Sequence, residues 1–216
     1  MTCKARSFAD MTLREFVDVI AGSEPTPGGG TASAVAGAIG AALASMVAGL
    51  TPDSSLSPEL AERMHHVGSR GRELAAALLD AADADTAAFN AVMAAYRMPK
   101  STDDEKVARR AAIQTAMRGA VDAPRATCTL AREGLALALF AAEHGNPNAA
   151  SDAGVGAMLL DTAMGGGSLN IRINLGSIKD PEFATEMRCF ADEADDARRV
   201  SCSEAMALAR AKIEGQ

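Results

Sequence analysis

The stretch PTPGGGTASAVAGAIGAALASMVAGL, residues 25–50, decides the fold of this chain. It opens with a proline-rich turn, continues with Gly28, Gly29 and Gly30, and then runs for twenty residues without a charge. Glycine can adopt positive φ, and free N–H groups at a helix start favour an anion or a polar ligand. The small side chains that follow let other helices approach the backbone closely. We therefore expect a central helix with a ligand-binding glycine turn at its start.

The composition indicates an all-α fold. The chain has 216 residues, of which 48% are apolar but only seven, six Phe and one Tyr, are aromatic, and none is Trp. A core of Ala, Leu, Val, Met and Ile is typical of packed helices rather than of a sheet sandwich. The length suits one domain over residues 1–216. We expect a bundle of long antiparallel helices around the small-residue central helix.

Charge and cysteine usage exclude several classes of function. The net charge is −7 and no basic block is present, so we expect no nucleic-acid partner. Cys3, Cys128, Cys189 and Cys202 are far apart, without a CxxC pair, and no signal-peptide pattern precedes them. This pattern predicts reduced thiols in a cytoplasmic protein.

The sequence gives no support for a metal site, a nucleotide loop or a membrane span. His65 and His66 are adjacent and cannot both face one metal ion on a helix, and His144 is alone. The glycine run is not a P-loop, because no Lys-Ser or Lys-Thr follows it. The uncharged helix is as long as a membrane span, but it is rich in Ala, Gly and Ser and lacks flanking basic residues. We expect a buried helix of a soluble protein.

Capping and breaking residues set the expected boundaries. Helices are predicted over residues 13–21, 31–50, 59–98, 103–143, 152–164 and 181–214. Thr12 and Thr102 each begin a capping box, with a Glu three residues later. Pro124 should bend or split the fourth helix.

Two further signals concern the end of the fifth helix. The three glycines at 165–167 should end it. The alternating LNIRINL at 169–175 then suggests an extended piece, although a helical or irregular connector also fits.

One acid stands out on the long helix over residues 59–98. At about 100° per residue, an apolar stripe forms along it, and Asp85 falls in the middle of this stripe. Asp83 points the opposite way and Asp80 lies to the side, as solvated charges. A carboxylate on a buried stripe loses hydration, so Asp85 either pairs with a helix end or a basic residue, or has a functional role.

Other polar positions leave two interpretations open. Lys100, in a predicted loop, is either a surface charge or an anion ligand. The loop GNPNAASD at 145–152 is suited to a ligand but is equally typical of ordinary turn chemistry. In that loop, Asn146 carries donors and acceptors, and Ser151 or Asp152 can cap the next helix.

Several motifs together resemble a known family. In order, they are PTPGGG (25–30), ASMV (44–47), DAD (83–85) followed by AF (88–89), PK (99–100), GN (145–146), SD (151–152), LN (169–170) and INL (173–175). Each motif is weak alone, but in this order they are similar to the cyclodeaminase/methenyltetrahydrofolate cyclohydrolase family over residues 12–214. Its members occur as free-standing enzymes and as the C-terminal domain of formiminotransferase-cyclodeaminase. The resemblance implies an all-helical homodimer that binds folate in a cleft between helices.

The resemblance also assigns residues. It places the key catalytic acid on Asp85, in agreement with the helical wheel. It implies pocket or scaffold roles, which we take as substrate binding, for a further set: Gly28, Gly29, Gly30, Lys100, Asn146, Ser151, Asp152, Asn170 and Asn174. The expected activity is hydrolysis of 5,10-methenyltetrahydrofolate to 10-formyltetrahydrofolate, with no metal or other cofactor.

Two alternatives remain open at this stage. One is formiminotetrahydrofolate cyclodeaminase activity, which releases ammonia, and the other is a folate-binding helical dimer without catalysis. The lack of a formiminotransferase domain favours the cyclohydrolase. In one respect the sequence departs from the family, whose members usually carry a Gly and two basic residues shortly after the central helix. Here Thr51 is followed by PDSSL, so binding of a polyglutamate tail is in doubt.

Overall fold

The computed structural model of the chain describes residues 6–215. Cys3 and the first five residues therefore lie outside the described part. The described residues form six α-helices and no strand, which confirms the all-α prediction. The helices are α1 (Leu13–Ile20), α2 (Gly29–Gly49), α3 (Pro58–Arg97), α4 (Asp103–His144), α5 (Ala150–Leu175) and α6 (Pro181–Glu214), with short 3-10 turns at Phe8–Asp10, Asp53–Ser55 and Pro147–Ala149.

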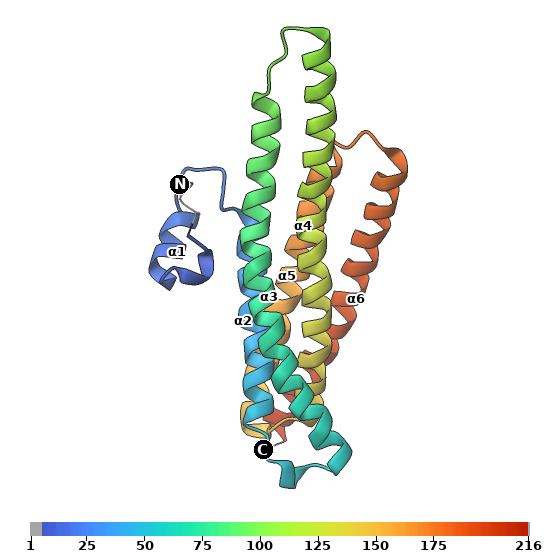
Figure 1. Ribbon diagram of the computed structural model, residues 1–216. Coiled ribbons are helices and arrows are strands. Elements are labelled where there is room, and N and C mark those ends of the chain that lie inside the picture. The colour runs from blue at the N-terminus through green and yellow to red at the C-terminus, as the bar shows by residue number, and fades with distance from the viewer. Residues whose placement is uncertain (1–5, 216) are drawn as a thin grey trace.

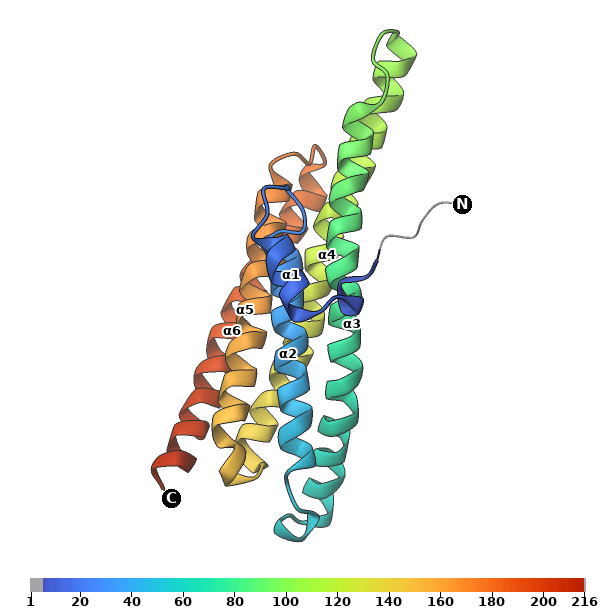
Figure 2. The same ribbon diagram turned by 90° about the vertical axis from the view of Figure 1, so that its left-hand side faces the viewer.

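Helices α2 to α6 form an elongated bundle (Figure 1). The α3–α4 hairpin extends beyond the other helices at one end, and α1 lies outside the bundle (Figure 2). Helix α2 packs against α3, α4 and α5. Its Ala34, Ala41 and Ala44 are fully buried, as expected for a central helix of small residues.

The composition of α2 follows from this packing. By length and mean hydropathy, 1.7, it is a helix that could cross a membrane. In the bundle, however, neighbouring helices approach its backbone: a Cβ at Gly40 would lie 2.7 Å from the Gly156 carbonyl oxygen, and one at Gly71 of α3 would lie 2.9 Å from the Ala41 carbonyl oxygen. Small residues are therefore required by helix-to-helix contact.

The predicted helix starts at Thr12 and Thr102 are confirmed. Each hydroxyl accepts from the amide of the Glu three residues later, and each Glu carboxylate accepts from the amide of the capping Thr. Each exchange satisfies two N–H groups that the helix leaves unpaired. Local sequence chemistry alone determines these two boundaries.

The glycines at 165–167 do not end a helix, so that prediction is wrong. Helix α5 continues through them to Leu175, and the segment 169–175 is helical rather than extended. A Cβ at Gly166 would lie 2.8 Å from Ser33 Cβ of α2, and one at Gly167 would lie 3.0 Å from the Pro124 carbonyl oxygen of α4. These glycines allow neighbouring helices to contact α5 on different sides.

Helix α4 passes through Pro124 without being split, which was one of the two effects expected of this residue. Two smaller expectations differ from the structure. Helix α5 begins at Ala150 and has no side-chain cap, so neither Ser151 nor Asp152 caps it. Among the described glycines none has positive φ, and Gly28 caps α2 in an extended conformation. The glycines of this turn are therefore not required in order to give a left-handed backbone conformation.

Candidate active site

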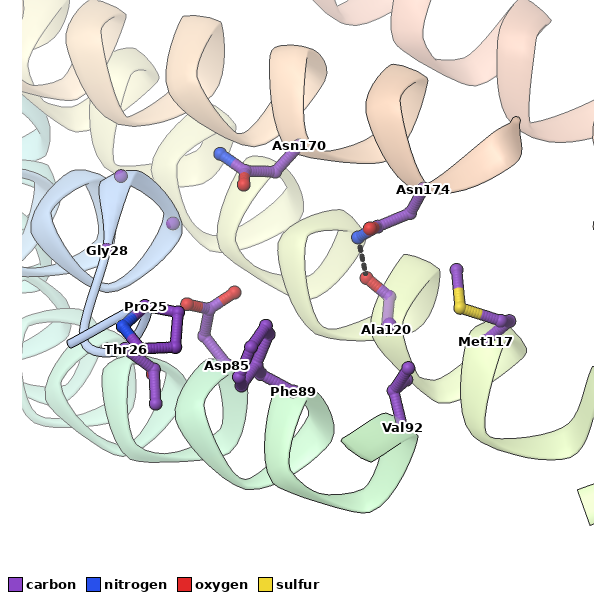
Figure 3. Close-up of a pocket in the computed structure, with 12 residues that line it drawn as sticks. Pro25, Thr26, Gly28, Asp85, Phe89, Val92, Met117, Ala120, Asn170 and Asn174 are labelled. Carbon is purple, nitrogen blue, oxygen red and sulfur yellow. Dashed lines mark hydrogen bonds between the residues drawn. The ribbon is translucent and has the colours of Figure 1, made fainter. Parts of the chain in front are cut away.

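A cavity of about 240 Å³ opens at the start of α2, where this helix meets α3, α4 and α5 (Figure 3). Its residues come from four parts of the chain far apart in sequence. They are Pro25, Thr26, Gly28, Gly29 and Gly30 before and at the start of α2, Asp85, Phe89 and Val92 of α3, Met117 and Ala120 of α4, and Asn170 and Asn174 of α5. Six of the ten residues expected to be catalytic or to bind substrate meet here.

Asp85 is the acidic group of this cavity. Its side chain is half-buried on α3 and points toward the glycine turn (Figure 3). Thr31, which is fully buried, donates a hydrogen bond of 2.9 Å from its hydroxyl to Asp85 Oδ2. Burial raises the pKa of the Asp85 carboxyl above its ordinary value, and the Thr31 hydroxyl and backbone amide oppose this rise only in part. Asp85 is therefore suited to exchange a proton.

Gly30 leaves room for the Asp85 carboxylate to lie against the start of α2. A Cβ at residue 30 would lie 2.7 Å from Asp85 Cγ and 2.8 Å from Oδ2, so any other residue there would force the carboxylate to move. The carboxylate thus rests against the first turn of α2, whose N–H groups lack intrahelical partners. The positive end of the α2 dipole faces it there. The glycine is required for close approach rather than for its backbone angles.

Hydroxyl groups form a chain behind the carboxylate. Thr86 Oγ1 lies 3.3 Å from Thr31 Oγ1 and 3.0 Å from Thr26 Oγ1. The chain links the turn before α2 with α3 and ends at Asp85. Thr26, Thr31 and Thr86 were not singled out from the sequence, although a hydroxyl in the first turn after a glycine run is a signal that could have indicated Thr31.

Two amides face the acid from α5. Asn170 Nδ2 donates to the Gly166 carbonyl at 2.8 Å, and Asn174 Nδ2 donates to the Ala120 carbonyl of α4 at 2.7 Å. Neither Oδ1 accepts a hydrogen bond from the described residues. The cavity therefore presents two amide oxygens and a carboxylate, all of them acceptors (Figure 3).

The far end of the cavity is apolar and its lining carries no cationic side chain. Phe89, Val92 and Met117 lie beyond Asp85 toward Asn174 (Figure 3). A site of this kind favours a flat ring that donates hydrogen bonds and carries positive charge. Its volume is below the roughly 300–1,000 Å³ of a drug-sized ligand site, so it encloses part of such a ligand.

Four residues expected at the site lie away from the cavity. Lys100 is exposed in the α3–α4 loop. The part of α3 between Asp85 and this loop spans twelve residues, or about 18 Å of helix. Asn146 contacts the other end of α2: its Nδ2 donates to the Leu50 carbonyl at 2.7 Å, and its backbone N–H donates to Thr51 Oγ1 at 2.9 Å. These hydrogen bonds join the end of α2 to the loop after α4, as expected of a scaffold residue.

Ser151 and Asp152 lie at the N-terminal end of α5, of which Ser151 is exposed and Asp152 half-buried. About 27 Å of helix separates Asp152 from Asn170 within one chain.

Asp83, predicted as a solvated charge, is instead half-buried and accepts from the Phe8 N–H at 2.9 Å. It anchors the N-terminal 3-10 turn to α3. Asp80 is exposed, as predicted.

No group of three or more His, Cys, Asp or Glu side chains within residues 6–215 could hold a metal ion. Charged side chains do cluster elsewhere: Arg198 pairs with Asp161 and Asp195 at 2.9 Å each. This cluster joins α5 to α6 and lies outside the cavity lining.

The fold and site define an all-helical protein with one half-buried carboxyl group, Asp85, in a cavity between helices, and comparison with known proteins agrees with this class. The family model of formiminotransferase-cyclodeaminase matches residues 12–193. The chain belongs to this family.

Its relatives include a methenyltetrahydrofolate cyclohydrolase of Methylorubrum extorquens, 42% identical over 81% of this chain and 84% of the relative. The formimidoyltransferase-cyclodeaminase of Gallus gallus is 37% identical over 81% of this chain but only 32% of its own length. The chain thus spans about a third of that relative. The crystal structure of formiminotetrahydrofolate cyclodeaminase from Thermotoga maritima has a TM-score of 0.84 at 28% identity, over 95% of this chain and 98% of that one.

Proposed function

We propose that this protein hydrolyses 5,10-methenyltetrahydrofolate to 10-formyltetrahydrofolate, with Asp85 as general base and then general acid. The observation that carries the proposal is the placement of Asp85, a carboxyl with a raised pKa, in a cavity whose lining has no cationic side chain. The methenyl bridge is an amidinium cation between N5 and N10. A cationic bridge is attracted to this lining, whereas a Lys or Arg would repel it. A relative that is 42% identical to this chain and is matched over 84% of its own length is named methenyltetrahydrofolate cyclohydrolase.

The proposed reaction has two steps. In the first, water attacks the methenyl carbon while Asp85 accepts one of its protons, which leaves a neutral carbinol. In the second, the carbon–N5 bond breaks as Asp85 returns this proton to N5. The carbinol O–H then loses its proton to solvent and becomes the formyl carbonyl on N10. One water is consumed and one proton is released.

The substrate's two ends have different requirements. The pterin is a flat ring with several N–H donors, which suits the amide oxygens and the apolar end of the cavity. The glutamate tail carries carboxylates, and the lining offers them no cation. We place the pterin and the bridge inside and the tail outside the cavity.

The alternative activity is cyclodeamination of 5-formiminotetrahydrofolate, favoured by the likeness to the Thermotoga maritima cyclodeaminase. One assay separates the two activities: methenyltetrahydrofolate absorbance is followed with purified protein, and ammonia is measured with the formimino compound. Loss of absorbance without ammonia release supports the cyclohydrolase. Ammonia release supports the cyclodeaminase, and no turnover of either compound contradicts both. We expect a chelator to leave turnover unchanged.

We also propose that the active form is a cytoplasmic homodimer. Helix α2 carries no charge, and together with α5 it exposes a set of large apolar residues: Ile39, Met46, Leu50, Val155, Met158, Leu169 and Ile173. A face of this kind is suited to a second copy of the chain. Cys128, Cys189 and Cys202 are unpaired, as suits a reducing compartment. Light scattering after gel filtration should give twice the mass of the chain, and Ile39→Glu should halve it.

A further inference from the structure

A proline inside α4 leaves one carbonyl without its helical partner. In an unbroken α-helix the N–H of residue 124 would donate to the carbonyl of residue 120. Pro124 has no N–H, and its ring displaces that carbonyl from the helix axis. The Ala120 carbonyl instead accepts from Asn174 Nδ2 of α5 at 2.7 Å (Figure 3). Pro124 itself is fully buried.

This contact determines how the Asn174 amide is oriented. A carbonyl oxygen can accept only from the NH2 side of the amide, so Nδ2 must face Ala120 and Oδ1 is the atom left for the cavity. Both Ala120 and Asn174 line that cavity. If residue 124 had an N–H and no ring, the Ala120 carbonyl would bond within α4 and would no longer be displaced from the helix axis. Its contact with the Asn174 amide, which orients that amide, would then be weakened.

The surroundings of Asn174 indicate what its oxygen accepts from. Phe89, Val92 and Met117 lie at the same end of the cavity and suit the faces of a flat ring (Figure 3). The lining has no cation for a carboxylate, so the glutamate end of a folate is disfavoured there. A ring N–H is the group that complements a lone amide oxygen in such a place.

We propose that Pro124 is a positioning residue: it frees the Ala120 carbonyl to hold Asn174, whose Oδ1 accepts from an N–H of the pterin ring. The proposal rests on the folate activity proposed above and names the ring-binding end of that same site. Pro124 does not touch the substrate and acts through Asn174.

A double-mutant cycle tests this role, with 5-formyltetrahydrofolate as the binding probe in titration calorimetry and methenyltetrahydrofolate as the substrate. Pro124→Ala should raise Kd and KM about three- to tenfold, as for loss of one hydrogen bond, while kcat stays within twofold. Asn174→Leu should do the same. The variant with both substitutions should bind no more weakly than Asn174→Leu alone, because the two residues act in series.

Gly119→Ala, in the same helix, serves as the control, because a Cβ there has no neighbour within 4 Å. It should leave Kd and KM unchanged. Independent losses that multiply in the double variant would overturn the role of Pro124. Where Pro124→Ala does not fold, unchanged binding by Asn174→Leu overturns the proposal. Absence of binding by the unaltered protein would instead contradict the folate function itself.

Discussion

Gly30 and Asp85 are in such close contact that a Cβ at residue 30 would lie 2.8 Å from Asp85 Oδ2. The position of the Asp85 carboxylate on α3 therefore depends on the size of the residue in the first turn of α2. Gly30→Ala should displace the carboxylate, lower kcat at least tenfold and reduce the free energy of unfolding by about 1–3 kcal/mol. Gly119→Ala is the control, and it should preserve kcat and raise stability by up to about 1 kcal/mol. Wild-type kcat in Gly30→Ala would show that the carboxylate's position is unimportant.

Thr31 should tune the pH dependence of turnover. Its hydroxyl donates to ionised Asp85 and so favours the charged form. In Thr31→Val this donor is lost, which should raise the pKa of Asp85 further. Since the first step needs the carboxylate, the acidic limb of kcat/KM against pH should move to higher pH.

Thr129→Val is the matched control, because Thr129 is exposed and bonds only to its own helix, at the Arg125 carbonyl. Its pH profile should superimpose on that of the unaltered protein. A limb for Thr31→Val that stays in place or moves to lower pH would exclude Asp85 as the titrating base.

Asn146 should contribute to stability rather than to binding. Its amide joins the end of α2 to the loop after α4 through Leu50, and its Oδ1 accepts from the Asn148 N–H at 3.0 Å. Asn146→Ala should lower the free energy of unfolding by about 1–2 kcal/mol and leave KM within twofold, as measured by urea denaturation and by initial rates. Lys100→Ala should change neither. A large increase in KM for either variant would indicate that the residue binds substrate and would contradict this prediction.

Replacement of Asp85 should stabilise the fold. Burial raises the pKa of Asp85 above its unfolded value of 3.8, so the native state favours the protonated acid. Its contribution to stability is then complete below about pH 3.8 and is lost as pH rises through the native pKa. Asp85→Asn, which stays neutral, should have a higher Tm than the unaltered protein at pH 7.5, and the difference should shrink in acid. An equal or lower Tm at pH 7.5 would contradict the burial of this charge.

Local patterns predicted much of this molecule. The capping boxes at Thr12 and Thr102 needed no tertiary information, and the position of Asp85 on the apolar stripe of α3 indicated its burial. The segment 169–175 suggests an extended piece because a short run can satisfy two periods at once, and the helical alternative that the sequence leaves open is the one observed. Ile171 and Leu175 are buried one helical turn apart, while Asn170 and Asn174 face the cavity with the same spacing.

The remaining errors have a tertiary cause. The glycines at 165–167 are helical because neighbouring helices approach them, which a single sequence does not reveal. Pro124 does not split α4, and α5 supplies a donor for the freed Ala120 carbonyl. Asp83 accepts from Phe8, a contact 75 residues apart in the chain. Each of these depends on a partner that local patterns do not contain.

The most direct test of the central claim is the rate of methenyltetrahydrofolate hydrolysis by Asp85→Asn, with exposed Asp80→Asn of the same helix as the control. We predict a fall of at least about a hundredfold in kcat, the lower range for loss of a general acid–base. Binding of 5-formyltetrahydrofolate should change little, and Asp80→Asn should be fully active. A kcat for Asp85→Asn within a few-fold of the unaltered protein would contradict Asp85 as the catalytic acid–base.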